Sequence, residues 1–179
     1  MPIVLRPATT ADAPSIAAIY SDSVLHGTAS YELEPPSVTE MEGRIAAVLS
    51  GGYPYLAAID EESGAVLGYA YASAFRTRPA YRWLVENSVY LAGDARGKGL
   101  GKRLLALLVA ECEQRGFRQM VAVIGGASPA SIALHKALGF AEAGRLTGTG
   151  FKHGHWLDTV FMQRALGEGN TSDPLPLSS

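Results

Sequence analysis

Arg96-Gly-Lys-Gly-Leu-Gly101 joins two apolar segments, and this short stretch decides the fold class of the chain. Residues 84–91 before it have the composition of a β-strand. After it, leucines recur at helical spacing from Leu100 to Cys112, and Gly116 follows where a helix ends. A strand, a glycine-rich turn and a helix in this order direct free backbone N–H groups and the positive end of the helix dipole at one point. The stretch predicts an anion-binding turn in an α/β fold.

The turn differs in charge from the rest of the chain. The 179 residues include 15 Lys and Arg against 17 Asp and Glu, a formal net charge of -2. The turn nevertheless gathers four basic residues: Arg96, Lys98, Lys102 and Arg103. Glycines at 97, 99 and 101 allow a ligand to approach the backbone closely. The chemistry fits a pyrophosphate, although the pattern alone also fits an ordinary turn with solvated lysines.

Other phosphate-binding motifs do not match. The P-loop pattern GxxxxGK[ST] is absent, and a Rossmann turn would follow the first strand and precede an acidic residue by about 20 positions. The overall charge offers no attraction to nucleic acid or to an anionic membrane, so we expect neither partner.

The remaining pattern predicts one α/β domain in the order β-α-α-β-β-β-α-β-α-β-β. The expected strands cover residues 3–6, 55–60, 66–75, 84–91, 120–124, 140–144 and 156–162. The expected helices are one ending at residue 26 and others over 37–50, 100–115 and 129–138. A turn at 61–64 makes the sheet partly antiparallel, and the loop over 27–36 is expected to act as a lid.

The domain is predicted to cover residues 1–166, followed by a disordered tail over 167–179 that is polar and contains two prolines. A single cysteine makes no internal disulfide and suits a reducing compartment. The longest apolar run, residues 104–110, is seven residues and cannot span a bilayer. The N-terminus lacks the pattern of a signal peptide, so we expect a cytoplasmic protein.

Several ordered segments resemble one superfamily, the GNAT N-acetyltransferases. They are the turn Arg96-x-x-Gly99-x-Gly101, Val85-Glu-Asn-Ser-Val-Tyr90, Val121-Ala-Val-Ile-Gly125, Leu134-His-Lys-Ala-Leu-Gly-Phe140 and Gly150-Phe-Lys-His-Gly-His-Trp156. Within the superfamily they are similar to the phosphinothricin and methionine sulfoximine acetyltransferases. The resemblance runs from about Ile3 to Arg164. It implies a GNAT fold with a central, mixed, mostly antiparallel twisted sheet flanked by helices, and a homodimer.

The resemblance also implies acetyl-CoA as co-substrate. The backbone at 89–91 would pair with the pantetheine arm like a further strand, and amides at 97–102 would hold the pyrophosphate. The family generally has asparagine at the position of Ser128, and serine reaches less far. The expected cofactor-binding residues are Val89, Tyr90, Leu91, Arg96, Gly97, Lys98, Gly99, Leu100, Gly101, Lys102, Ser128 and Ser131.

Two residues are expected to serve catalysis. Acyl transfer to an amine needs a base for the amine and a proton for the departing thiolate. Glu86 lies in an apolar run before the turn, where burial would raise its pKa. The alternative is a solvated glutamate or a pair with Arg82. His135 stands where many GNAT enzymes carry a tyrosine acid, while a structural histidine is the alternative. The resemblance favours catalytic roles for both.

The substrate-binding residues are expected to be Arg76, Glu86, Ser88, Tyr31 and Lys152. The guanidinium of Arg76 can hold a carboxylate or phosphinate with two parallel bonds, and Arg78 and Arg82 compete for this role. Tyr31 in the 27–36 loop, with Lys152 and His153 later in the chain, would close the pocket; each also has a structural or solvent-facing alternative.

Other chemistry is not expected. Cys112 lies on the apolar stripe of its helix, where an inert thiol is expected, so transfer would be direct. His153 and His155 have no cysteine pair or carboxylate cluster beside them, so we predict no metal. The predicted reaction is acetylation of the primary amine of a small amino-acid-like molecule. The alternatives are another amine, such as a protein N-terminus or an aminoglycoside, and a CoA-binding sensor without turnover.

Overall fold

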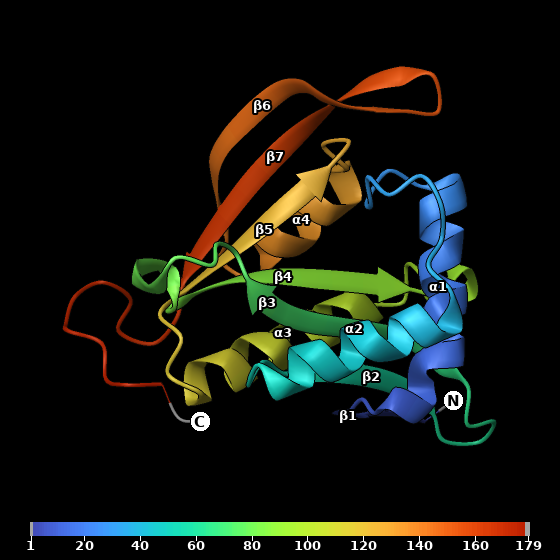
Figure 1. Cartoon of the computed structure of the whole chain (residues 1–179), viewed down its shortest axis with the longest axis horizontal. Helices are drawn as coiled ribbons and strands as arrows, with labels where there is room; N and C mark the ends of the chain where they lie inside the picture. The colour runs from blue at the N-terminus through green and yellow to red at the C-terminus, as the bar shows by residue number, and fades with distance from the viewer. Residues whose placement is uncertain (1, 178–179) are drawn as a thin grey trace.

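Residues 2–177, which the computed structural model describes, contain a seven-stranded sheet with the order β1-β2-β3-β4-β5-β7-β6 (Figure 1). Strands β4 and β5 pair in parallel, and every other neighbouring pair is antiparallel. The predicted mixed, mostly antiparallel sheet is therefore confirmed. The strands are β1 (Ile3–Pro7), β2 (Tyr55–Asp60), β3 (Val66–Ala74), β4 (Leu84–Leu91), β5 (Gln119–Gly125), β6 (Ala141–Lys152) and β7 (His155–Ala165).

Helices cover both faces of this sheet. They are α1 (Ala13–His26), α2 (Val38–Ser50), α3 (Leu100–Gln114) and α4 (Pro129–Ala137), with short 3-10 turns at Thr10–Asp12, Pro79–Tyr81 and Gly93–Ala95. The predicted cap of α2 forms, because the Ser37 hydroxyl accepts the N–H of Glu40 at 3.1 Å. Ser128 caps α4 in the same way by accepting the N–H of Ser131 at 3.4 Å.

The two faces have separate hydrophobic cores. On the α1 and α2 face, Ile16 and Ile45 are fully buried against the rings of Tyr55 and Tyr69. On the α3 and α4 face, Leu104, Leu108, Met120 and Val160 are fully buried. Each such side chain contributes about 1.5–3 kcal/mol through burial. The sheet is therefore anchored from both sides, which fixes the strands that carry the site.

Strands β6 and β7 are longer than the sequence predicts. They form a ribbon of 12 and 11 residues, joined by the turn at His153 and Gly154, whose φ angles are 51° and 76°. Since β6 is an edge strand whose residues are mostly exposed, it lacks the period-two alternation on which the prediction depends. The outer part of the ribbon extends past the end of β5 and projects over the end of α1 (Figure 1).

The segment after Leu166 is irregular chain to Leu177. Leu166 is fully buried, and the tail is tethered beyond it: the indole N–H of Trp83 donates to the Leu175 carbonyl at 3.2 Å, and Arg118 donates to the Ser172 carbonyl at 3.0 Å. The boundary at residue 166 and the disorder of the tail in solution stay predictions, and residues 178 and 179 lie outside the described residues.

Candidate active site

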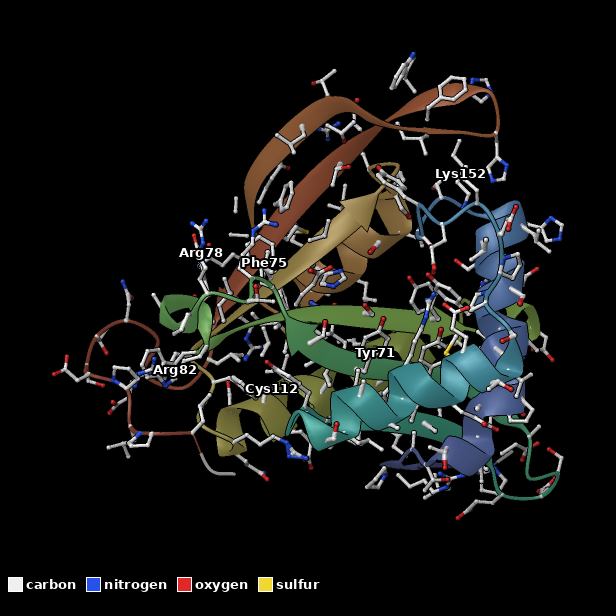
Figure 2. The ribbon with its side chains drawn as sticks, viewed as in Figure 1. Tyr71, Phe75, Arg78, Arg82, Cys112 and Lys152 are labelled. Atoms are coloured by element: carbon white, nitrogen blue, oxygen red, sulfur yellow. The ribbon has the colours of Figure 1, made fainter. Side chains whose placement is uncertain are left out.

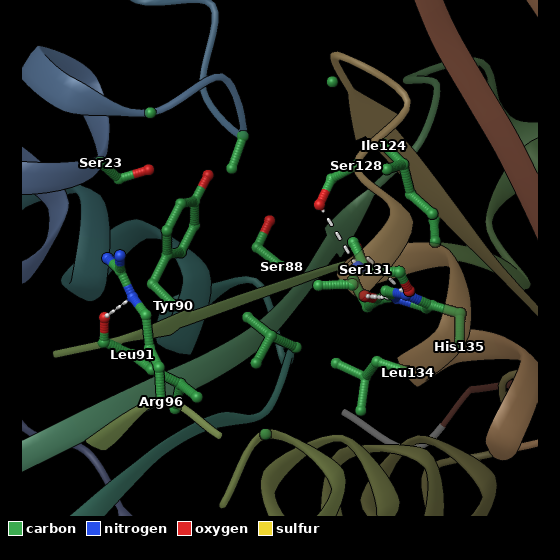
Figure 3. A pocket seen from close by; sticks show the side chains of 18 of the residues that line it. Ser23, Ser88, Tyr90, Leu91, Arg96, Ile124, Ser128, Ser131, Leu134 and His135 are labelled. Atoms are coloured by element: carbon green, nitrogen blue, oxygen red, sulfur yellow. Dashed lines mark hydrogen bonds between the residues drawn. The ribbon is translucent and has the colours of Figure 1, made fainter. Parts of the chain in front are cut away.

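The site lies where β4 and β5 separate. Their parallel pairing covers Leu84 to Asn87 and ends at Asn87 and Ala122, whereas β4 continues to Leu91 and β5 to Gly125. A cavity of about 620 Å³ opens at this split, lined also by the ends of α1 and the starts of α3 and α4 (Figure 3). The edge of β4 beyond Asn87 therefore faces the cavity with its backbone groups.

The glycine-rich turn forms one end of this cavity. Gly97 and Gly99 have φ angles of 74° and 76°, in the left-handed region that favours glycine, and a Cβ at either would meet nothing within 4 Å. Gly99 is the N-cap of α3, whose first amides have no partner inside the helix. The turn and helix therefore present free N–H groups to an open space, which suits a diphosphate.

The basic residues of the turn point in different directions. Arg96 forms an ion pair with Asp22 of α1 at 3.0 Å and also donates to the Leu91 carbonyl at 3.4 Å (Figure 3). Lys102 lines the cavity, whereas Lys98 is an exposed residue of the turn outside the lining. Arg103 donates to the Ile3 carbonyl at 3.1 Å and so faces β1.

The other predicted cofactor residues come together at the cavity. Its wall includes Val89, Tyr90, Leu91, Arg96, Gly97, Gly99, Leu100, Gly101, Lys102, Ser128 and Ser131. A Cβ at Gly101 would lie 3.5 Å from side chains of both Leu91 and Leu134, so α3 approaches β4 and α4 closely here.

Glu86 lines the cavity from β4. Burial raises the pKa of its carboxyl, and the positive charge of Arg76 opposes that rise. Strand alternation places Glu86 on the same face as Ser88 and Tyr90. A carboxyl whose pKa lies above its ordinary range is suited to accept a proton near neutral pH.

His135 lies on α4 and is 4% exposed. Its Nδ1 is 2.7 Å from the Ser131 carbonyl oxygen, and its Nε2 is 2.9 Å from Oδ1 of Asn87. The pKa of the ring is lowered, chiefly by burial, and the hydrogen bond to the Ser131 carbonyl opposes that shift. Sequence reasoning missed Asn87; its only signal is an amide side chain in an apolar strand, a position where asparagine is uncommon.

The three candidate arginines have different surroundings; Arg78 and Arg82 are labelled in Figure 2. Arg76 is exposed, lies over the Phe75 ring at 4.8 Å and acts on the charge of Glu86. Arg82 lies instead over the ring of Trp83 at 3.8 Å, and Arg78 is exposed at the start of the 3-10 turn. The geometry favours Arg76 over the other two as the cation next to Glu86.

Tyr31 and Lys152 are engaged elsewhere. The Tyr31 hydroxyl is 2.8 Å from Oγ1 of Thr159 and accepts the N–H of Gly126 at 3.2 Å. The ammonium of Lys152, on a side chain that is 4% exposed, donates to the Ser30 carbonyl at 2.7 Å (Figure 2). Burial lowers the pKa of Lys152. Both residues fasten the 27–36 loop to the β6–β7 ribbon, and neither lines the cavity. The loop expected to act as a lid is therefore held to the ribbon at residues 30 and 31.

Other chemistry has little support in the part of the chain that is described. Cys112 is buried in the core, which raises the pKa of its thiol to about 12. Residues 2–177 hold no group of three His, Cys, Asp or Glu side chains placed to bind a metal ion. Nor does any helix among them have the length and apolar character needed to cross a membrane.

The split strands, the glycine-rich turn with free amides and the half-buried carboxylate of Glu86 are the features expected of a site that transfers an acyl group from a diphosphate-containing carrier. Residues 5–161 match the Acetyltransferase (GNAT) domain family. The chain belongs to this family of acetyltransferases, and the resemblance and fold expected from the sequence are confirmed.

Individual relatives are similar along most of the chain. A phosphinothricin N-acetyltransferase from Alcaligenes faecalis is 51% identical over 91% of this chain and 82% of its own. An L-methionine sulfoximine/L-methionine sulfone acetyltransferase from Pseudomonas paraeruginosa is 42% identical over 89% of this chain and 92% of its own. A crystal structure of a phosphinothricin acetyltransferase from Sinorhizobium meliloti in complex with AcCoA is 60% identical, has a TM-score of 0.95 and covers 98% of this chain and 94% of that one.

Proposed function

We propose that the protein transfers the acetyl group of acetyl-CoA to the primary amine of a small amino-acid-like acceptor of the phosphinothricin, methionine sulfoximine or methionine sulfone type. The observation that carries this proposal is the placement of Glu86 in the wall of the cavity at the β4–β5 split, with the glycine-rich turn at one end and the cationic Arg76 near the carboxylate. The similarity to relatives with these activities supports the same assignment.

Acetyl-CoA fits the cavity through the backbone. The free amides from Gly97 to Lys102 hold the diphosphate, and the edge of β4 from Val89 to Leu91 pairs with the amide groups of the pantetheine arm. The Ser128 hydroxyl already accepts the N–H of Ser131 in the cap of α4, so it contributes less to the pantetheine than the family's asparagine would.

The reaction proceeds by direct attack. Glu86 takes a proton from the acceptor ammonium, directly or through a water molecule, and the neutral nitrogen attacks the thioester carbonyl. The nitrogen of the tetrahedral intermediate still carries two protons. As the intermediate collapses and the C–S bond breaks, the nitrogen loses one of them to Glu86, which has passed the first proton to solvent, and the thiolate takes a proton. His135 lines the same cavity and is the proposed source of that proton. The buried thiol of Cys112 takes no part, so no acyl-enzyme forms.

Arg76 selects the acceptor. Its exposed guanidinium binds the carboxylate or phosphinate of the acceptor, which orients the amine toward Glu86. Ser88, on the same strand face as Glu86, also lines the cavity (Figure 3) and is a further proposed contact of the acceptor. Tyr31 and Lys152 support this pocket indirectly: they hold the 27–36 loop in place, and residues 27–29 of that loop line the cavity.

The proposal extends to assembly and location. We infer a homodimer, as the family resemblance implies, in the cytoplasm, as the single cysteine suggests, where acetylation of phosphinothricin would protect the cell. Light scattering of the protein as it elutes from a size-exclusion column measures its oligomeric state, and cell fractionation measures its location. Growth of cells on phosphinothricin with and without the gene measures the protection.

The deciding experiment is an acceptor panel. Purified protein is incubated with acetyl-CoA and phosphinothricin, methionine sulfoximine, methionine sulfone, a peptide with a free N-terminus or an aminoglycoside, while thiol release and product mass are followed. Release with the first three and an acetylated amine in their products are expected. Preference for the peptide or the aminoglycoside contradicts the acceptor class, and binding of acetyl-CoA without any thiol release identifies a sensor.

A further inference from the structure

Asn87 is the last residue of β4 that pairs with β5. Its side chain is 6% exposed and points to the face covered by α4, where it contacts His135. Buried amide groups are costly unless both ends are hydrogen bonded. Asn87 meets this condition with two partners from two different elements, and those partners define its orientation.

The orientation of the Asn87 amide is fixed by the neighbouring strand. Its Nδ2 donates to the Val121 carbonyl of β5 at 3.2 Å, and a carbonyl accepts only from a donor. The other end, Oδ1, must therefore face Nε2 of His135 at 2.9 Å as an acceptor. The second ring nitrogen, Nδ1, lies 2.7 Å from another acceptor, the Ser131 carbonyl, and 3.5 Å from the Ser131 hydroxyl.

Both ring nitrogens of His135 face hydrogen-bond acceptors, so both contacts form only if each nitrogen carries a proton. A neutral imidazole has one N–H, so it leaves either Oδ1 of Asn87 or the Ser131 carbonyl facing a lone pair. An imidazolium satisfies both acceptors. Burial is the larger influence and lowers the pKa of His135. The two acceptors oppose this loss of the charged form, so the fraction of protonated ring depends on whether both are present.

Few other groups influence this balance. On β4 the titratable neighbour is Glu86, which strand alternation turns to the opposite face. On α4 the charged neighbour is Lys136, which is exposed. The residues of β5 that face this pair are apolar, and β5 contacts Asn87 through the Val121 carbonyl. The ring of Phe140 packs edge-on against the His135 ring, with the ring centroids 5.0 Å apart.

We propose that Asn87 is a positioning residue for acetyl transfer: by accepting the Nε2–H of His135 at the β4–β5 split, it holds the ring in place and favours its doubly protonated form over the neutral one. The extra proton goes to the sulfur of the departing thiolate, which leaves neutral His135 and free thiol. The acceptor nitrogen loses one proton before attack and a second on collapse, both to Glu86, which passes the first to solvent in between. Solvent exchange then restores both groups. The catalytic part of this inference rests on the proposed function.

Two variants separate this role from a structural one. Asn87→Asp and Asn87→Leu both lose the bond to Val121, but the aspartate keeps an acceptor facing His135 and the leucine does not. Side-chain nitrogen NMR follows the titration of His135 in each protein, with His135→Asn used to assign its signals among the four histidines. The midpoint is expected to move to lower pH in Asn87→Leu and to higher pH in Asn87→Asp.

Activity gives a second readout. At saturating substrates, kcat of Asn87→Leu is expected to fall about 10-fold or more near pH 8, because a hydrogen bond to a charged group has been lost. The limb of the pH profile that needs protonated His135 moves to lower pH. In Asn87→Asp that limb moves to higher pH, so much of the activity at alkaline pH returns. The KM for acetyl-CoA stays within about twofold in both variants, since neither touches the anion-binding turn.

Two results would overturn the proposed role of Asn87. A purely structural role makes the two variants lose thermal stability alike and leaves the His135 midpoint where it is; that result overturns the inference. If Asn87→Leu does not fold, an unmoved midpoint in Asn87→Asp alone overturns it. The NMR titration needs no acceptor, so a wrong acceptor class under the proposed function would leave this measurement intact.

Discussion

Glu86 and Asn87 are consecutive in β4, and their side chains serve opposite faces of the sheet. Asn87 contacts His135 on the α4 face, whereas the charge of Glu86 acts on the pKa values of Tyr71 and Tyr90 on the α1 and α2 face. Both side chains line the cavity that opens where the strands separate. The proposed base and the proposed acid therefore reach this cavity from opposite faces of the sheet.

Glu86→Gln is expected to lower kcat by about 100-fold or more, because the amide cannot accept a proton from the ammonium. Burial raises the pKa of Glu86, so wild-type activity should rise with pH through a value above the ordinary glutamate range, where the base becomes ionised. The variant should lack this rise. Steady-state kinetics between pH 4 and pH 9 measure both effects.

Glu62→Gln is the matched control for this variant. Glu62 is exposed on the turn between β2 and β3, so its substitution should leave the profile unchanged. If Glu86→Gln also keeps the wild-type profile and kcat, Glu86 has no part in proton transfer.

Arg76→Ala is expected to raise the KM for phosphinothricin by about 10-fold or more, because a charged partner of the acceptor anion is lost, with little change in acetyl-CoA binding. The same change removes the charge that holds down the pKa of Glu86, so the acid limb of the profile should move to higher pH. Arg78→Ala, in the same exposed connection, is the control. An equal loss of affinity for both substrates would assign Arg76 to general folding instead.

The parts of the fold predicted from the sequence are those with local signals. The capping serine at position 37, the glycines at 97 and 99 and the leucine stripe of α3 each act within a few residues, so their structural meaning can be read directly. The length of β6 could not be predicted, because an exposed edge strand needs no apolar face and its sequence therefore carries no alternation.

The site was predictable only in part for a similar reason. Glu86 and His135 follow from the resemblance, but the bond between His135 and Asn87 joins residues 48 positions apart, and nothing in either segment indicates it. Likewise, Tyr31 and Lys152 contact partners 128 and 122 positions away. The sequence suggested that Tyr31 and Lys152 close the substrate pocket, whereas their long-range hydrogen bonds hold the 27–36 loop to the β6–β7 ribbon.

Gly150→Ala tests that fastening. A Cβ at Gly150 would lie 2.7 Å from the Tyr31 ring, so the ring and its loop must move. We expect a loss of about 1–3 kcal/mol of stability from this overpacking and a higher KM for the acceptor. Gly144→Ala, also in β6, is the control because its Cβ would meet nothing within 4 Å. Equal unfolding free energies and KM values for the two variants would show that the loop does not depend on Tyr31.

Asp12→Asn tests the entry into α1. Asp12 is 8% exposed and accepts two bonds from Arg6, at 2.8 and 2.9 Å, and the Thr9 N–H at 2.8 Å. Chiefly the bond from Arg6 lowers the pKa of Asp12. Its stabilisation is therefore present above the unfolded-state pKa and is lost as pH falls through the lower folded-state pKa.

Because Arg6 is 39% exposed and partly screened by solvent, the variant is expected to be about 1–2 kcal/mol less stable at pH 7. The difference should shrink toward pH 2. Denaturant unfolding at a series of pH values measures it, and a difference that is independent of pH would exclude the ion pair as its cause.

Cys112→Ala should leave kcat unchanged. The thiol lies at 0% exposure on the core side of α3, and burial raises its pKa to about 12, so almost none of it is the nucleophilic thiolate near neutral pH. Direct transfer does not use it, and the variant is expected to lose only about 1 kcal/mol of stability from the vacated volume. Iodoacetamide should likewise fail to inactivate the folded enzyme, although it alkylates the unfolded chain. Loss of turnover in a folded Cys112→Ala protein, or an acetylated cysteine trapped by mass spectrometry, would instead require an acyl-enzyme and a path for the thiol out of the core.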